Sequence, residues 1–222
     1  MPPDLGLFDL VIVDEASQSD ITALPAIMRG KKILIVGDDK QVSPSSIGIE
    51  ERQIIQLRTT FLKGNPYADQ MDPGSSLYDL ASIVFPGKAI MLREHFRCVE
   101  PIIRFSSQFY EQPLVPLRLP TSAERIDPPL VDIFVTDGKR DARGINEAEA
   151  QAVLQEIKTI VEDSAFQHRS IGVISLIGDK QAKRIYDLLL KEISAEQFSQ
   201  HKIMCGNAAT FQGQERDIVF LS

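Results

Sequence analysis

Two short apolar runs near the start of the chain each end in a cluster of polar side chains. Residues 10–13 are followed directly by Asp14 and Glu15, and residues 32–36 are followed by Gly37-Asp38-Asp39-Lys40-Gln41. Continuous apolar runs of this length are typical of strands buried on both faces of a parallel sheet. The polar clusters then lie at the carboxyl ends of the strands, where open α/β sheets bind ligands.

The apolar pattern predicts strands and helices in alternation along the whole chain. We expect strands over residues 8–14, 32–36, 88–93, 130–135, 170–176, 202–205 and 218–221. We expect helices over residues 17–28, 50–63, 76–85, 100–110, 146–163 and 180–193. This alternation predicts an α/β fold with parallel sheets. A proline-rich stretch over 113–129 predicts a linker between a first domain, 1–112, and a second, 130–222.

Composition excludes some classes of protein and leaves others open. The 222 residues carry a net charge of −7, so a nucleic-acid surface would have to be a local patch. Cys98 and Cys205 are far apart and match no metal-ligand spacing, which favours a reduced, intracellular, cytoplasmic protein. No apolar run approaches the length of a membrane span, so we expect no membrane partner.

The two polar clusters suit a magnesium-nucleotide site. Asp14 can hold the metal and Glu15 can orient or deprotonate the attacking water. Gln41 can reach a terminal phosphate or that water, and Gly37 lets the backbone approach a ligand closely. The alternatives are an acidic helix N-terminus, in which Glu15 and Asp20 favour the helix dipole, and an ordinary polar turn.

Two later stretches carry further candidate groups. Arg97 can contact phosphate oxygens, and Phe96 can stack on a flat base. The alternatives are a surface ion pair between Arg97 and a nearby acid, and a core position for the Phe96 ring. Before the last apolar run, Gly213 permits close approach, Glu215 can accept hydrogen bonds from a ribose hydroxyl, and Thr210 can contact a nucleic-acid phosphate. The alternative for this last stretch is a charged loop before a strand.

In order and spacing, these stretches resemble motifs II, III, IV and V of superfamily 1 helicases. The resemblance rests on Val-Asp-Glu-Ala-Ser-Gln (13–18), Val-Gly-Asp-Asp-Lys-Gln (36–41), Phe-Arg with the downstream Pro-Ile-Ile and Ser-Gln-Phe-Tyr (96–110), and Phe-Gln-Gly-Gln-Glu-Arg-Asp (211–217). It is strongest for the 1B branch that contains the nonsense-mediated-decay RNA helicases and their bacterial relatives. It implies two RecA-like domains of the P-loop NTPase fold, with ATP between them, that translocate on single-stranded DNA or RNA.

By position, the resemblance implies roles around the nucleotide. Asp14, at the end of the Walker B strand, would coordinate Mg²⁺, and Glu15 would be the catalytic base. Gln41 would sense the γ-phosphate, and Arg97 would act as an arginine finger. Phe96 would stack on the base. It stands where the family often has Tyr in Tyr-Arg-Met, so the ring is kept and the hydroxyl is lost.

The resemblance also implies contacts further from the reacting phosphate. Gly213 and Glu215 would lie by the sugar and phosphates, and Thr210 would lie toward nucleic acid. Ser43 and Pro44 would lie there too, although the family often has Leu-Pro-Pro where this chain has Val-Ser-Pro.

The sequence contains no phosphate-binding motif G-x-x-x-x-G-K-[ST], and motif VI is also absent. We therefore expect a fragment of a longer helicase, with part of the first RecA-like domain and most of the second. The isolated chain would be inactive and would have the remainder of the parent as its partner. Without the strand that precedes the phosphate-binding motif, the apolar strands 10–13 and 32–36 would be poorly covered, and the chain could associate with itself through an open sheet edge. The alternative function is a non-catalytic nucleic-acid-binding scaffold derived from a helicase.

Overall fold

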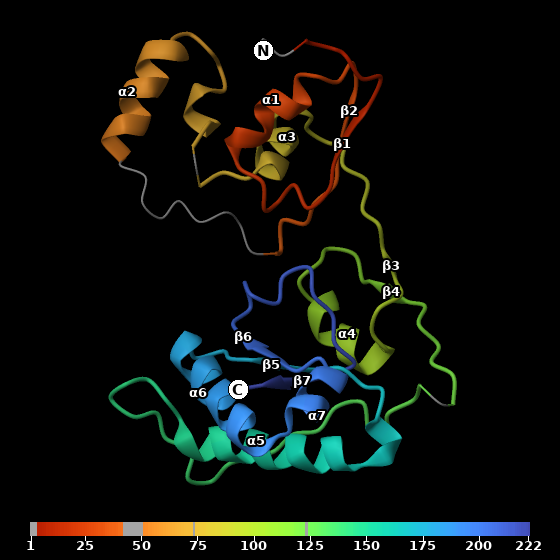
Figure 1. The fold of residues 1–222 in the computed structure, drawn as a ribbon. Helices are drawn as coiled ribbons and strands as arrows, with labels where there is room; N and C mark the ends of the chain where they lie inside the picture. The colour runs from red at the N-terminus through yellow and green to blue at the C-terminus, as the bar shows by residue number, and fades with distance from the viewer. Residues whose placement is uncertain (1–3, 42–50, 73, 123) are drawn as a thin grey trace. The chain divides into compact units, whose positions relative to one another are not determined.

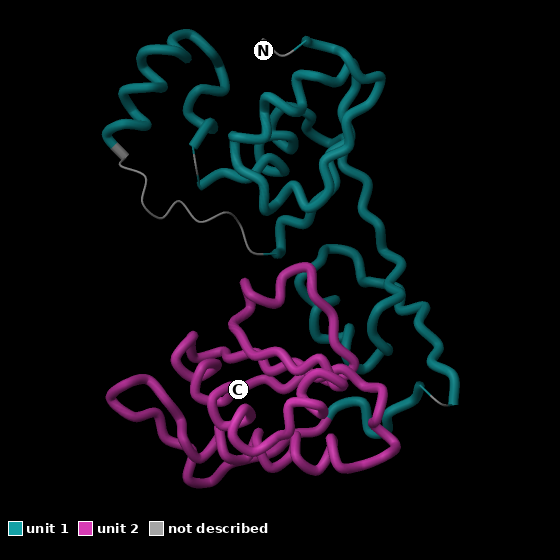
Figure 2. The backbone as a smooth tube through the Cα atoms, in the orientation of Figure 1, with its two compact units in different colours: residues 1–130 teal, residues 131–222 magenta. Residues whose placement is uncertain are grey.

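The computed structural model describes residues 4–41, 51–72, 74–122 and 124–222. The chain forms two compact units, residues 1–130 and residues 131–222 (Figure 2). Each unit is described by itself below. In the described part of the chain, none of the helices has the length and apolarity needed to cross a bilayer.

Unit 1, residues 1–130, begins with a strand–helix–strand arrangement (Figure 1). Strand β1 (Val11–Val13) pairs in parallel with β2 (Ile33–Ile35), and Ile12 lies opposite Leu34. The connection contains a short 3-10 helix, η1 (Ile21–Ala23), and α1 (Leu24–Ile27). The sequence predicted one helix over 17–28. The helical part is shorter because it begins only after Asp20. This residue is the N-cap, and its side chain accepts a hydrogen bond from the Thr22 amide.

The rest of unit 1 is made of short elements. These are α2 (Glu51–Phe61), η2 (Ala68–Gln70), α3 (Leu77–Val84), β3 (Glu94–His95), α4 (Glu100–Ser107) and β4 (Val115–Pro116). A reciprocal capping box between Ser76 and Asp79 fixes the start of α3. Pro101 stands in the first turn of α4, where proline is tolerated. β3 and β4 pair in parallel as a separate two-stranded sheet.

β1 and β2 are not buried on both faces, although their apolar runs alone would favour it; they are poorly covered in the described structure, as expected for a fragment. Helix α1 contacts β1 and α3 contacts β2, but the opposite face of the sheet is exposed. Ile12 is 59% exposed there, and Leu10, Leu34 and Val36 are exposed beside it. An apolar run identifies residues that favour burial, but it does not determine what covers them.

Unit 2 contains a three-stranded parallel sheet in the order β6-β5-β7. Its elements are α5 (Glu147–Glu162), η3 (Ser164–Phe166), β5 (Ile171–Ile174), α6 (Asp179–Glu192), α7 (Ala195–Gln200), β6 (Met204–Gly206) and β7 (Ile218–Leu221). Helices α5 and α6 cover one face of the sheet (Figure 1). Ile157, Ile185 and Leu189 of these helices are fully buried against Ile171 and Val173 of β5.

An ion pair ties the two helices of unit 2 together at the surface. The Arg184 guanidinium of α6 donates to the Glu147 carboxylate of α5, with 2.7 Å between Nε and Oε2. This hydrogen bond lowers the pKa of Glu147 to about 2. The pairing therefore supplements the apolar contacts that join α5 to α6.

Two predicted strands do not form, and helix α7 was not predicted. Residues 88–93 and 130–135 are irregular, with Ile90 87% and Phe134 85% exposed. A strand needs a neighbour for its backbone groups, and an apolar stretch alone does not provide one. Helix α7 begins at a capping box in which Ser194 and Gln197 satisfy each other's backbone amides. The Ser-x-x-Gln spacing was a readable signal for it.

Candidate nucleotide-binding rim

The carboxyl ends of β1 and β2 form one rim, and backbone hydrogen bonds continue beyond the strands. The Val36 amide donates to the Val13 carbonyl at 2.9 Å, and the Ala16 amide donates to the Val36 carbonyl at 2.8 Å. The Asp38 amide then donates to the hydroxyl of Ser17, which is buried, at 3.2 Å. The structure therefore confirms that the two strands are parallel neighbours whose polar clusters share an edge.

Asp14 and Glu15 lie at this rim with exposed side chains. The Glu15 backbone has φ of +52°, a left-handed conformation that residues other than glycine rarely adopt. Its amide donates to Asp14 Oδ1 at 2.9 Å. Gln18 Nε2 donates to Glu15 Oε2 at 2.8 Å. The first helical residue is Ile21, so the helix-dipole interpretation fits Asp20 but does not fit Glu15.

Gly37 is required by close packing where the second cluster leaves the sheet. A Cβ atom at Gly37 would lie 2.8 Å from the Tyr78 ring and 3.0 Å from the Ser17 backbone nitrogen. The backbone of α3 reinforces this packing, because the Tyr78 amide donates to the Ala16 carbonyl at 3.2 Å. The glycine allows the second cluster to lie directly against the loop that follows Asp14 and Glu15.

The Asp38 carboxylate joins the second cluster to the end of α4. Its Oδ2 accepts from the Tyr110 hydroxyl at 2.6 Å and from Gln41 Nε2 at 2.9 Å. Burial opposes ionisation of Asp38, but these hydrogen bonds outweigh it and lower the pKa of the carboxyl group. Burial and the bond to Asp38 raise the pKa of Tyr110 to about 12. Neither Asp38 nor Tyr110 was assigned a role from the sequence, although a half-buried tyrosine usually needs a partner for its hydroxyl.

Phe96 and Arg97 follow β3 in unit 1, and both side chains are exposed. Phe96 is 63% exposed, so its interpretation as a core aromatic is wrong. The preceding residue, His95, is structural: its Nε2 accepts from the Cys98 amide at 2.9 Å. Burial, together with the charge of Arg97, lowers the pKa of His95.

Thr210 lies at the carboxyl end of the unit 2 sheet. Its amide and hydroxyl both donate to Asn207 Oδ1, and Asn207 donates to Asp179 in the first turn of α6 at 2.6 Å. Gly206 makes room for this turn, since a Cβ there would lie 2.6 Å from Thr210 Cβ. A hollow of about 310 Å³ lies beside these residues, lined also by Ala182, Lys183, Tyr186 and Cys205.

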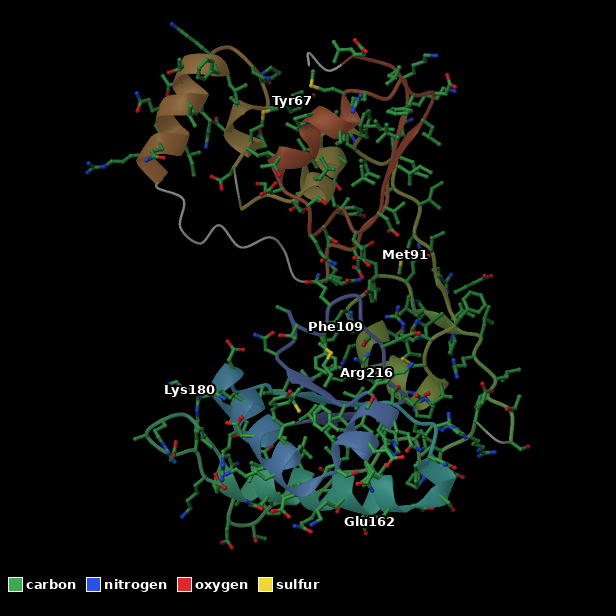
Figure 3. The ribbon with its side chains drawn as sticks, viewed as in Figure 1. Tyr67, Met91, Phe109, Glu162, Lys180 and Arg216 are labelled. Atoms are coloured by element: carbon green, nitrogen blue, oxygen red, sulfur yellow. The ribbon has the colours of Figure 1, made fainter. Side chains whose placement is uncertain are left out.

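The loop that precedes β7 packs on the second face of the same sheet. Phe211 is buried, and its ring would lie 2.7 Å from a Cβ at Gly172 in the middle of β5. Gly213 has φ of +72°, a conformation that favours glycine, and Glu215 beside it is exposed. Arg216 anchors the loop (Figure 3): its guanidinium donates to the Lys202 and Glu215 carbonyls, at 3.2 Å and 2.7 Å.

The structure thus brings Asp14, Glu15 and Gln41 to one rim. Phe96 and Arg97 follow β3 in the same unit, and Thr210, Gly213 and Glu215 belong to unit 2. Ser43 and Pro44 lie outside the described residues. Within the described ranges, no group of three or more His, Cys, Asp or Glu side chains is arranged to hold a metal ion by itself.

Comparison with known proteins gives two family matches and two similar relatives. Models described as AAA domains match residues 4–47 and residues 74–222. An uncharacterised ATP-dependent helicase of Mycoplasma pneumoniae is 27% identical over 235 residues, which cover all of this chain and 20% of the relative. Its counterpart in Mycoplasma genitalium is 26% identical with the same coverage. The chain therefore spans about a fifth of the length of these curated relatives.

Proposed function

Because the chain belongs to the AAA-domain family, we propose that it forms part of the motor core of an ATP-dependent helicase. In this proposal the motor couples hydrolysis of Mg-ATP to movement on single-stranded DNA or RNA. The resemblance to superfamily 1 helicases drawn from the four motifs agrees with the family matches and with the names of both relatives. We further propose RecA-like folds for the two domains, residues 1–112 and 130–222, with 113–129 as the linker.

The observation that carries the proposal is the shared rim of β1 and β2. Asp14 and Glu15 follow one strand and Asp38 to Gln41 follow its parallel neighbour, with Ser17 hydrogen-bonded across the gap. Polar groups on adjacent strand ends are the usual ligand position of an open α/β sheet. This shared edge supports the proposal that the two clusters act on one bound molecule.

The donor set at the rim fits magnesium held together with a nucleotide. Mg²⁺ prefers oxygen ligands, and it usually binds through one or two carboxylates, water and substrate phosphates instead of a protein cage. Asp14 offers such a carboxylate, and one of its oxygens accepts from the Glu15 amide. When bound, the metal would neutralise charge on the phosphates. This fit makes Asp14 the proposed metal ligand.

The proposed roles of the other unit 1 residues follow from their chemistry. Glu15 acts as the base that orients the attacking water, and its carboxylate is already held by Gln18. Gln41 contacts the terminal phosphate or that water. Arg97 supplies a permanent positive charge for developing charge on the phosphate, and Phe96 offers an exposed ring for the base.

The proposed contacts of unit 2 lie in the loops after β6. Thr210 binds a nucleic-acid phosphate beside the 310 Å³ hollow, while Gly213 and Glu215 serve the nucleotide sugar and phosphates. Ser43 and Pro44 are proposed as further nucleic-acid contacts in unit 1. The isolated chain is proposed to be inactive in hydrolysis, since its sequence contains no phosphate-binding motif.

Nucleic-acid binding by the 222-residue chain tests the part of the proposal that needs no hydrolysis. Fluorescence anisotropy with a labelled single-stranded oligonucleotide is expected to show binding that weakens as salt rises. Thr210→Ala should weaken binding about threefold to tenfold, the range for one hydrogen bond, while Thr210→Ser retains the hydroxyl and the affinity. Thr159→Ala, on an exposed position of α5, is the matched control. Equal affinity of Thr210→Ala and the wild type would remove Thr210 from the interface.

A further inference from the structure

The carboxylate of Asp38 is the centre of a small network at the rim. One of its oxygens, Oδ2, accepts from both Gln41 Nε2 and the Tyr110 hydroxyl, and Oδ1 accepts from the Lys40 amide. The backbone amide of Asp38 is itself bonded to Ser17. Tyr110 lies 72 positions further along the chain, just beyond α4. The network therefore ties two distant segments of unit 1 to the same carboxylate.

This arrangement fixes which end of the Gln41 side chain faces Asp38. An ionised carboxylate only accepts hydrogen bonds, so the amide nitrogen of Gln41 must face it. The carbonyl oxygen of Gln41, Oε1, then points away from Asp38. A rotation that exchanged Nε2 and Oε1 would bring Oε1 against the Asp38 carboxylate, and both of these groups are acceptors. Hydrogen bonds to a charged acceptor are about twice as strong as neutral ones, which favours this single orientation.

We propose that Tyr110 is a positioning residue that acts through Asp38 on Gln41. Its hydroxyl holds the Asp38 carboxylate in place, and the carboxylate in turn presents Gln41 with Oε1 available to accept a hydrogen bond from the attacking water. This inference rests on the proposed function, in which Gln41 contacts that water or the terminal phosphate. The inference also means that a shift of Tyr110, just beyond α4, would change the orientation of Gln41 at the rim.

Nuclear magnetic resonance of the ¹⁵N-labelled 222-residue chain tests the network directly. The side-chain amide signal of Gln41 is assigned by its loss in Gln41→Glu. In Tyr110→Phe we expect the Gln41 amide protons to exchange with solvent at least about tenfold faster, the lower end for losing one hydrogen bond to a charged group. Tyr67→Phe, which removes a phenol hydroxyl elsewhere in unit 1, should leave that rate unchanged. Unchanged backbone signals in α2 and α3 would show that unit 1 of the variants is folded.

A double-mutant cycle decides whether Tyr110 acts through Asp38. Asp38→Asn should accelerate Gln41 exchange at least as much as Tyr110→Phe, and adding Tyr110→Phe to it should produce no further change. A Gln41 exchange rate in Tyr110→Phe equal to the wild type would overturn the inference. Additive effects of the two substitutions would also overturn it, because Tyr110 would then act by another route.

Kinetics separate positioning from a general structural role. In a longer, hydrolysis-competent protein that contains this chain, Tyr110→Phe should lower kcat about tenfold and leave the KM for ATP unchanged, as expected for a contact made in the reaction itself. A variant with lower stability and a raised KM for ATP, but an unchanged kcat, would indicate a structural role and contradict the inference. A different result would separate the two proposals. If the Gln41 amide protons exchange faster in Tyr110→Phe, but the Gln41 amide signal of the longer protein does not shift when a non-hydrolysable ATP analogue and Mg²⁺ are added, the network stands and the proposed function fails.

Discussion

The two units of this chain hold their shape by different means. Unit 2 has a continuous apolar core between α5, α6 and β5, with several side chains fully buried. Among the described residues of unit 1 few apolar side chains are buried, and one face of its β1–β2 sheet is exposed. Its rim is instead fixed by hydrogen bonds to Ser17 and Asp38 and by the packing of Gly37 on Tyr78.

This difference separates stability from the placement of chemical groups. Apolar burial is roughly proportional to area and has no direction, so it stabilises unit 2 without orienting polar atoms. Hydrogen bonds at half-buried carboxylates are directional and fix individual side chains. Unit 1 therefore carries hydrogen-bonded polar groups on a sheet with one exposed face, while unit 2 is built around an apolar core.

The largest expected contrast comes from shortening one isoleucine in each unit. Ile157→Ala in unit 2 should lower the free energy of unfolding by about 2–5 kcal/mol, since it leaves a cavity in a closed core. Ile12→Ala in unit 1 should change it by about 0.5 kcal/mol or less, because that side chain is already 59% exposed. Hydrogen exchange read by mass spectrometry reports the two units separately.

Equal losses for the two variants would break the comparison. They would show that the open face of β1 and β2 is covered in solution, for example by a second copy of the chain. Repeating the Ile12→Ala measurement over a range of protein concentrations distinguishes self-association from a fixed cover, because only self-association depends on concentration.

A smaller contrast is expected from adding one methyl group at a tight glycine in each unit. Gly172→Ala would press on Phe211 and should cost about 1–3 kcal/mol in unit 2, with Phe211→Leu relieving part of the loss. Gly37→Ala would press on Tyr78 and should speed exchange mainly in residues 36–41. Loss of protection throughout unit 1 in Gly37→Ala would show that the rim also holds the unit together.

The sequence predicted the helices around the unit 2 core better than the rest of the chain. Helices α5 and α6 were found nearly residue for residue because their apolar stripes are long and face a core. The predicted strand over 88–93 in unit 1 failed, and so did the one over 130–135 where unit 2 begins, because the apolar residues at both places have no neighbouring strand in the described structure. The apolar pattern therefore predicts an element reliably where a sheet or helix packs against it, and unreliably where no such neighbour is present.

The rim was predictable in part. Two apolar runs ending in Asp14-Glu15 and in residues 37–41 sufficed to place both clusters on one edge. The bond from Tyr110 to Asp38 was not predictable, because it joins positions 72 residues apart and depends on how the chain returns after α4. The same holds for the packing of Phe211 on Gly172, which requires knowing which face of β5 the later loop covers.

Steady-state phosphate release decides whether the rim belongs to a nucleic-acid-driven motor. The assay compares the longer protein that we propose to contain this chain, with and without single-stranded nucleic acid, against its Glu15→Gln and Arg97→Ala variants. We expect turnover that nucleic acid stimulates and that falls by at least about a hundredfold in Glu15→Gln, the scale of general acid–base catalysis. Turnover that is unchanged in Glu15→Gln would contradict the assignment of this rim as the catalytic site.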